Sequence, residues 1–282
     1  MEKLQTLHCG KFRLALVRPL IMGIVNVTPD SFSDGGRHDS PQAGIEHGLR
    51  LLEEGADILD VGGESTRPGA APVGLEAEMQ RVLPVIEALA GRSIPVSVDT
   101  YKPEVMRAAI AAGSSMVNDI NALQENGALE AVANSGAAVC LMHKQGDPGT
   151  MQQQPQYRDV VGEVEAFLRQ RMAAAEAAGI GRERLVVDPG FGFGKSLAHN
   201  LALLRHLDCF ACLGVPVLAG LSRKSMLGQI AGLEVGERLH ASVAAAVLAA
   251  MKGAKIIRVH DVRATRDALQ IVQAVEEQEE ET

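Results

Sequence analysis

At 282 residues, the chain is long enough for one large α/β domain, and its 46% hydrophobic and 22% charged residues are ordinary for a globular protein. A formal net charge of −8, without a dense block of Lys or Arg, argues against nucleic acid or an anionic membrane as the main partner. The first residues lack the apolar segment of a signal peptide, and no run approaches the ~20 apolar residues of a membrane helix. We therefore expect a cytoplasmic protein that acts on small molecules.

The four cysteines are few and scattered, which suits a reducing compartment. Cys140 lies in an apolar run, and we expect it to be a small core residue. Cys209 and Cys212 have CxxC spacing, but no second pair accompanies them, so we do not expect a zinc or redox site there.

Residues 6–17 alternate weakly in hydrophobicity and turn at Gly10 and Lys11, which predicts a short hairpin. After it, short apolar runs alternate with longer helical patterns, several of which begin at a proline or end at a glycine. The predicted strands cover residues 21–27, 57–61, 95–99, 115–119, 137–143, 185–188, 215–220 and 255–260. The predicted helices cover residues 42–55, 75–90, a segment that begins near 103, 128–134, 158–178, 199–207, 223–231, 237–252 and 262–277.

Eight β/α units in about 260 residues predict an α/β protein with a closed (β/α)₈ TIM barrel. We expect one domain over residues 1–282, with the hairpin in residues 1–18 and an acidic tail over 276–282. The strands are continuous apolar runs, as parallel strands covered on both faces should be. An open doubly wound sheet is the alternative, but it usually has fewer strands, and no GxGxxG motif follows the first strand.

Every predicted strand ends in a polar side chain, although its interior is apolar. In a parallel barrel all the C-terminal strand ends lie on one rim, and active sites of this fold lie there. The strand-end residues are Asn26, Asp60, Asp99, Asn118, His143, Asp188, Ser222 with Arg223 and Lys224, and Arg258 with His260. A single strand-end carboxylate is as often a helix N-cap as a ligand, so it is the coincidence of all the ends that predicts a binding site.

The strand-end residues divide into two chemical groups. Asp99, Asn118 and Asp188 are acceptors that suit a ligand with adjacent N–H donors, such as the edge of a 2-amino-pyrimidinone. The cationic residues, which suit phosphate, are Arg67, Arg223, Lys224, Arg258 and His260. Asn26 supplies a neutral oxygen that can hold Mg²⁺ together with phosphate oxygens and water. We therefore expect a flat heterocycle at one end of the site and a pyrophosphorylated group at the other.

Residues 188–195 (DPGFGFGK) join a strand end to a glycine-rich loop that contains Phe191 and Phe193. The chain has only six Phe, two Tyr and no Trp, so aromatic residues in a loop need a reason. We expect the glycines to let the backbone approach a flat ligand, and the phenylalanines to stack on its ring. A tight turn with both phenylalanines folded back onto the sheet is the alternative.

Seven segments between about residue 20 and 275 resemble, in order, the motifs of the dihydropteroate synthase family. They are residues 26–36 (NVTPDSFSDGG), 60–69 (DVGGESTRPG), 97–100 (SVDT), 118–120 (NDI), 188–194 (DPGFGFG), 222–225 (SRKS) and 258–260 (RVH). The resemblance implies a homodimeric barrel enzyme of folate biosynthesis that uses Mg²⁺. Such an enzyme condenses 6-hydroxymethyl-7,8-dihydropterin diphosphate with 4-aminobenzoate to 7,8-dihydropteroate and pyrophosphate, and sulfonamides compete with the aminobenzoate.

By matching position, the resemblance also implies roles for individual residues. The pterin would be bound by Asp99, Asn118, Asp188 and Lys224, and the diphosphate by Arg258, His260 and Asn26 through Mg²⁺. The aminobenzoate side would be formed by Thr66, Arg67, Pro68, Phe193 and Ser225, and Met142 would be a further substrate contact. Asp99, Asp188, Lys224 and Arg258 would be catalytic, and the loops 27–37 and 62–72 would close over the substrates.

The chain departs from the family at Lys144, where Met is frequent, and at Tyr101, where a smaller residue is frequent. Because pyrophosphate is a good leaving group, we expect a dissociative, SN1-like displacement. One rival is a pterin-binding methyltransferase that passes a methyl group to a corrinoid, which needs no pyrophosphate site. A non-catalytic pterin-binding barrel is a second rival, but the intact Lys224, Arg258 and His260 argue against it.

Overall fold

A computed structural model describes residues 6–28, 41–65, 72–146, 151–152 and 154–279 of the chain. Its strands are β1 (Thr6–Cys9), β2 (Phe12–Ala15), β3 (Leu20–Asn26), β4 (Ile58–Gly62), β5 (Val96–Asp99), β6 (Met116–Asp119), β7 (Ala138–Met142), β8 (Leu185–Asp188), β9 (Leu218–Ala219) and β10 (Ile256–Val259). Its α-helices are α1 (Pro41–Glu53), α2 (Leu75–Ala90), α3 (Pro103–Ala111), α4 (Ala128–Ala133), α5 (Val160–Ala177), α6 (Leu197–Arg205), α7 (Ser225–Ala231), α8 (Leu239–Met251) and α9 (Val262–Glu279). No helix in these ranges is long and apolar enough to cross a membrane.

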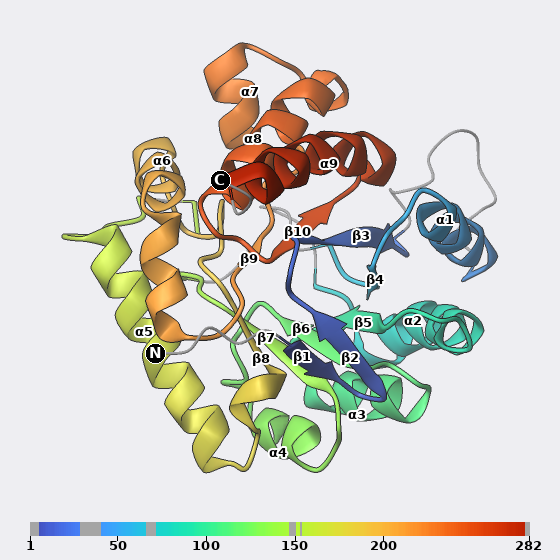
Figure 1. Cartoon of the computed structure of the whole chain (residues 1–282). Helices are drawn as coiled ribbons and strands as arrows, with labels where there is room; N and C mark the ends of the chain where they lie inside the picture. Colours follow the sequence, from blue (N-terminus) through green and yellow to red (C-terminus); the bar gives the residue numbers. More distant parts are fainter. Residues whose placement is uncertain (1–5, 29–40, 66–71, 147–150, 153, 280–282) are drawn as a thin grey trace.

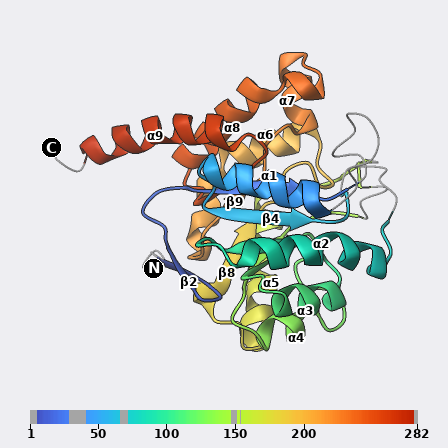
Figure 2. The same ribbon diagram turned by 90° about the vertical axis from the view of Figure 1, so that its right-hand side faces the viewer.

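Eight parallel strands form a nearly closed barrel surrounded by helices (Figures 1 and 2). The order of the strands is β8-β7-β6-β5-β4-β3-β10-β9. The ring closes between β8 and β9 through a single bridge from Val187 to Val217, supported by a hydrogen bond of 3.0 Å from Val187 N to the Pro216 carbonyl. β9 is shorter than the predicted 215–220 because Pro216 has no N–H to donate to a ladder. The barrel prediction is confirmed, and the open-sheet alternative is wrong.

The predicted hairpin is confirmed, and it covers the N-terminal end of the barrel. β1 and β2 pair antiparallel, from Thr6 opposite Ala15 to Cys9 opposite Phe12. Leu7 and Cys9 are fully buried in a cluster that contains the first residues of several barrel strands, among them Met116 and Ile256. The hairpin therefore closes the barrel at the end opposite the strand C-termini.

The inward side chains of the barrel change from apolar to polar along its axis. The lower and middle positions belong to one apolar cluster that includes Met22, Ile58, Cys140 and Val186. The predicted core role of Cys140 is thus confirmed. The inward positions toward the C-terminal ends of five strands are polar: Asp60 on β4, Ser97 and Asp99 on β5, Asn118 on β6, Asp188 on β8 and Arg258 on β10. All the polar inward residues therefore lie toward one end of a barrel that is otherwise sealed with hydrocarbon.

Three 3₁₀ helices among the described residues were not expected from the sequence: Arg182–Arg184, Leu207–Leu213 and Val235–Glu237. The helix over Leu207–Leu213 follows α6 and leads into β9. Its buried residues Leu207, Phe210 and Leu213 recur every three residues, which is the period of a 3₁₀ helix rather than an α-helix. Cys209 and Cys212 are free and exposed.

We predict that Leu7→Ala destabilises the protein by about 3 kcal/mol, because it removes a fully buried side chain that seals the barrel. Urea unfolding measures the difference. Val17→Ala is the matched control: Val17 is 83% exposed in the connection to β3, and its loss should change stability by about 0.5 kcal/mol or less. Equal effects of the two substitutions would contradict a structural role for the hairpin.

Candidate active site at the C-terminal rim of the barrel

Arg258 of β10 lies at the centre of a hydrogen-bonded network of strand ends. Its Nε donates to Asp60 Oδ2 at 2.6 Å, and its Nη2 donates to Asp99 Oδ2 at 2.7 Å. Asn118 Nδ2 donates to the same oxygen of Asp60 at 3.0 Å. Arg258 is 198 residues from Asp60 and 159 residues from Asp99 in the sequence. The barrel thus brings together Asp99, Asn118 and Arg258, which were expected in the site. Asp60, a strand-end residue with no role of its own assigned from the sequence, is the shared partner of Arg258 and Asn118.

Asp188 and Lys224 form a second group of opposite charges. Asp188 Oδ1 accepts a hydrogen bond from the Gly190 amide at 2.7 Å, and Lys224 Nζ donates to the Phe191 carbonyl at 2.7 Å. The two charges act on each other and on Arg258. Lys224 Nζ also lies 4.2 Å from the centre of the Phe193 ring, a cation–π distance. Ser225, at the start of α7, is exposed directly after Lys224.

Burial shifts Asp99, Asp188 and Lys224 toward their neutral forms, whereas at Arg258 burial is outweighed by the carboxylate partners, which raise its pKa. Burial raises the pKa of Asp99 to about 7, an effect that Asp60, Glu78 and Asp119 increase and Arg258 opposes. Burial likewise raises the pKa of Asp188, against the Gly190 amide and Lys224. It lowers the pKa of Lys224 to about 8, with the carboxylate of Asp188 opposing the shift. Opposed shifts of this kind in a cleft are typical of functional sites.

A small apolar cluster stands beside these charges. It contains Ile120, Met142, Met151 and Phe193, with Tyr101 packed against it. Met142 pairs in register with Asp188 across β7 and β8, so the cluster and the carboxylate lie on the same rim. The rim therefore offers hydrogen-bond acceptors next to apolar side chains, as a flat, polar-edged ring requires.

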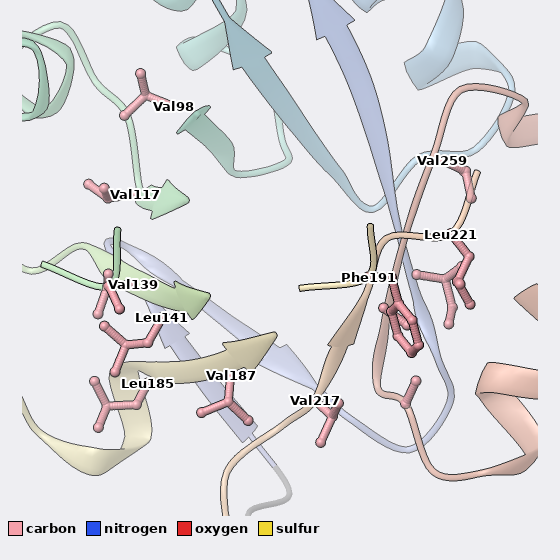
Figure 3. Close-up of a cluster of buried hydrophobic side chains, with 14 of the residues drawn as sticks. Val98, Val117, Val139, Leu141, Leu185, Val187, Phe191, Val217, Leu221 and Val259 are labelled. Atoms are coloured by element: carbon pink, nitrogen blue, oxygen red, sulfur yellow. The ribbon is translucent and has the colours of Figure 1, made fainter. Parts of the chain in front are cut away.

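The expectation for Phe191 is wrong. Its ring is buried in the core among Val187, Val217 and Leu221 (Figure 3). The one bridge of the β8–β9 seam joins Val187 to Val217, and both residues belong to the same core cluster as Phe191. Phe191 thus follows the folded-back alternative, whereas Phe193 lies beside Lys224.

Two of the loop glycines have a structural role that was not expected from the sequence. Gly190 and Gly194 have φ of 71° and 62°, where side chains are strained. A Cβ on Gly190 would lie 1.9 Å from the His143 carbonyl oxygen, and one on Gly194 would lie 2.2 Å from that of Gln145. These two glycines are therefore required because the loop passes close to the segment after β7.

Lys195 was not assigned a role from the sequence. Its side chain is buried, and its Nζ contacts His143 Nδ1 at 3.0 Å and donates to the carbonyls of Gly190 and Phe193, both at 2.9 Å. Burial lowers its pKa to about 7. Lys195 thus ties the glycine-rich loop to the end of β7. The signal for it in the sequence was a lysine that closes a glycine-rich loop.

His143, one of the strand-end residues, does not join the Arg258 network. Its ring meets the edge of Phe167 on α5 with the centroids 4.9 Å apart, and burial with the nearby Lys195 charge lowers its pKa to about 3. Arg223 also differs from expectation, because it pairs with Asp261 on the surface rather than facing the pocket. His260 Nδ1 shares a hydrogen bond of 3.0 Å with Ser222 Oγ.

Asn26 is half-buried at the end of β3. No cluster of three or more His, Cys, Asp or Glu side chains that could hold a metal occurs in the part of the chain that the structure describes. The side-chain oxygen of Asn26 alone is too few ligands for Mg²⁺. It fits the ion only when substrate phosphates and waters supply the other ligands, as is usual for Mg²⁺. The donor set therefore fits an ion bound together with a diphosphate.

The predicted residues Thr66, Arg67 and Pro68 lie outside the described residues, as does most of the two loops expected to close over the substrates. Of the two departures from the family, Tyr101 donates to Glu64 Oε1 at 3.4 Å beside the ion pairs of Lys102 with Glu64 and Glu78. The charge of Lys144 acts on Asp119 and opposes the burial that raises the pKa of that carboxyl.

Comparison with known proteins agrees with this geometry. A family model described as "pterin binding enzyme" matches residues 22–260. A dihydropteroate synthase from Escherichia coli (strain K12) is 54% identical over 262 residues, which is 93% of each chain. The solved structure of the Xanthomonas albilineans dihydropteroate synthase with 4-aminobenzoic acid is 58% identical, with a TM-score of 0.91, over 96% of this chain and 98% of that one. Another structure from that organism, in complex with 7,8-dihydropteroate, is 52% identical, with a TM-score of 0.86 over the same shares.

These matches extend over nearly the whole chain and include the network of charged strand ends. The chain therefore belongs to the pterin-binding enzyme family and, within it, to the dihydropteroate synthases, which are transferases.

Proposed function

We propose that the protein condenses 6-hydroxymethyl-7,8-dihydropterin diphosphate with 4-aminobenzoate, forming 7,8-dihydropteroate and pyrophosphate. The observation that carries the proposal is the network in which Arg258 joins the carboxylates of Asp60 and Asp99. The solved relatives that contain 4-aminobenzoic acid and 7,8-dihydropteroate support the choice of substrates.

The pterin binds between the carboxylates. Asp99, Asn118 and Asp188 accept hydrogen bonds from the N–H groups at its edge, and Met142 and Phe193 contact its ring system. Such contacts favour the ionised carboxylates, so the bound pterin lowers the pKa of Asp99, which burial raises in the free protein.

The diphosphate binds to Arg258 and His260, and Lys224 contacts the pterin. Because Arg258 also donates to Asp99, the pterin and its diphosphate are recognised by two residues that contact each other. Mg²⁺, when bound by Asn26 and phosphate oxygens, supplies further positive charge to the leaving group. The 4-aminobenzoate binds beside Phe193 and Ser225, with Thr66, Arg67 and Pro68, and sulfonamides compete there.

The displacement is dissociative. Its barrier is the separation of charge at the pterin methylene carbon, and fixed charges lower such barriers when they already face the developing charge. Asp99 and Asp188 stabilise cationic character on the pterin, while Arg258 stabilises the departing pyrophosphate. No covalent nucleophile is needed: Cys140 is fully buried, and burial raises the pKa of its thiol well above the usual value.

We predict that Asp99→Asn raises the activation barrier by about 3 kcal/mol, a loss of roughly 150-fold in kcat/KM for the pterin substrate, because it removes a fixed charge beside the pterin. Steady-state kinetics with saturating aminobenzoate measures it. Asp208→Asn, at an exposed position on the 3₁₀ helix, is the matched control and should be neutral. Normal turnover by Asp99→Asn would contradict the charge assignment.

We predict a bell-shaped dependence of kcat/KM on pH. Below its pKa of about 7, Asp99 is protonated and loses acceptor capacity, so activity falls as the pH decreases. Above its pKa of about 8, Lys224 loses its charge, so activity falls as the pH increases. A profile in kcat/KM reports these groups in the free enzyme. The Asp99→Asn variant should lose the acidic limb alone, and an unchanged acidic limb would assign it to another group.

A pyrophosphate-release assay distinguishes the proposal from its rivals. The protein should release one pyrophosphate for each dihydropteroate formed, and only when both substrates are present. The corrinoid methyltransferase and the non-catalytic barrel release none. Absence of pyrophosphate from folded protein with Mg²⁺ and both substrates would reject the proposed reaction.

The proposal includes a homodimer formed through α8 and α9. The sequence of α8, LHASVAAAVLAAM, is apolar on most of its surface, which is typical of a helix buried on all sides. Yet Leu248 and Met251 on α8 and Ile271 and Val275 on α9 are about half exposed or more. The two helices pack together, and α9 projects from the body (Figure 2). A second copy of the chain is the occupant that the dihydropteroate synthase resemblance implies.

We predict that Met251→Glu halves the mass of the protein in solution, because the residue is 66% exposed in this apolar surface and a charge there opposes association. Size-exclusion chromatography with light scattering measures the mass. Val17→Glu, at an exposed apolar position on another part of the surface, should leave the mass unchanged. A monomeric wild-type protein would refute the dimer.

A further inference from the structure

Asp60 binds two residues of the proposed site, although it lies too deep to touch a substrate. It is fully buried, and its Oδ2 accepts from both Arg258 Nε and Asn118 Nδ2. It pairs in register with Ser97, which is one inward position below Asp99 on β5. We propose that Asp60 is a positioning residue that orients Arg258 toward the diphosphate and Asn118 toward the pterin. This inference rests on the proposed function.

The register of the barrel explains why Arg258 needs this support. Arg258 pairs with Met22, and Met22 pairs with Ile58, so the arginine starts one inward position below Asp60. Its long side chain must pass Asp60 to reach Asp99 near the rim. Nε, the donor nearest the backbone, binds Asp60, and Nη2, further along, binds Asp99. Asp60 therefore fixes the direction of the side chain before its end reaches the pocket.

The same contact decides which donors remain for a substrate. Guanidinium has five N–H groups, and the two hydrogen bonds to Asp60 and Asp99 use two of them. Three are left for phosphate oxygens. Without Asp60, the only carboxylate bonded to the guanidinium would be Asp99, which the pterin also requires. Asp60 thus gives Arg258 a carboxylate partner that the pterin does not require, in addition to the bond from Nη2 to Asp99.

Asp60 also fixes the amide of Asn118. Because Nδ2 donates to Asp60, the Oδ1 atom of Asn118 is turned away from Asp60 and is available to accept from a ligand. An amide with no such partner can flip and present a donor instead. Asp60 therefore makes Asn118 an acceptor, which is the role the pterin edge needs.

The second oxygen of Asp60 indicates how the residue itself is held. Asp60 Oδ1 and Ser97 Oγ are buried, and neither has a hydrogen-bond partner among the described residues. The two residues face each other on neighbouring strands. Buried polar atoms without partners are costly, and one internal water between a carboxylate and a hydroxyl satisfies both. We therefore expect one internal water to join Asp60 and Ser97 in the positioning unit.

The test compares Asp60→Asn with Asp57→Asn. Asp57 is also an arginine-paired aspartate, bonded to Arg18 and the Ile21 amide at the other end of the same strand region, so it controls for the loss of a structural ion pair. We expect Asp60→Asn to raise the KM for the pterin diphosphate by about tenfold or more, with the KM for 4-aminobenzoate changed by about twofold or less. Asp57→Asn should change neither. Equal effects of Asp60→Asn on both KM values, or none, would overturn the inference.

A second readout separates positioning from a merely structural role. Asp99 is influenced by Asp60 on β4, Glu78 on α2, Asp119 on β6 and Arg258 on β10, and the charge of Asp60 raises its pKa. In Asp60→Asn the acidic limb of the kcat/KM profile should therefore move to lower pH. An acidic limb at unchanged pH in Asp60→Asn would count against an effect of Asp60 on Asp99. Wild-type protein that releases no pyrophosphate would instead reject the proposed function.

A crystal structure of wild-type protein with the pterin diphosphate keeps the inference testable if Asp60→Asn does not fold. We expect Arg258 Nε to remain on Asp60, and a water to lie about 3 Å from both Asp60 Oδ1 and Ser97 Oγ. Arg258 turned away from Asp60 in the complex would overturn the positioning role. A direct hydrogen bond between Ser97 and Asp60 would overturn the water.

Discussion

The structure depends on keeping several charges inside a protein barrel. Asp60, Asp99, Asp188, Lys224 and Arg258 approach one another at the end of a hydrocarbon core, where an unpaired charge costs several kcal/mol. The guanidinium of Arg258 between two carboxylates is the contact that makes this arrangement tolerable. The opposite charges do not fully offset the cost of burial. The pKa of Asp99 is therefore raised and the pKa of Lys224 is lowered. In the proposed function, a ligand with N–H donors at one end and phosphate at the other would complete the pairing.

The rest of the molecule places these charges. The hairpin and the apolar inward residues close one end of the barrel, so polar side chains can meet only at the other end. Phe191 in the core and the buried Lys195 hold the glycine-rich loop in place. Lys195 Nζ contacts His143 Nδ1 and donates to the carbonyls of Gly190 and Phe193. Phe193 is therefore presented by a loop with few degrees of freedom, and Lys224, directly before α7, donates to the Phe191 carbonyl of the same loop. Such preorganisation is what electrostatic catalysis requires, because little reorganisation remains at the moment of reaction.

The sequence alone determined the (β/α)₈ barrel, the hairpin and the convergence of Asp99, Asn118 and Arg258. Strand and helix periods are local signals, and the parallel topology then requires all strand ends to lie on one rim. The motifs also identified the family. The same local reading could not say that Arg223 turns outward to Asp261, or that His143 faces α5, because the direction of a strand-end side chain depends on its neighbours in space.

Tertiary structure decided the roles that depend on register and packing. Whether Phe191 stacks on a ligand or fills the β8–β9 seam depends on how the barrel closes, which no local pattern records. The glycines at 190 and 194 were recognised as special, but the partner that excludes a side chain is the segment after β7, about fifty residues away. Asp60 was visible as a strand-end carboxylate, yet only the stagger of β3, β4 and β10 places it between the backbone of Arg258 and the rim. The sequence determines which residue types lie at the strand ends, whereas the shear of the sheet determines which of these residues come into contact.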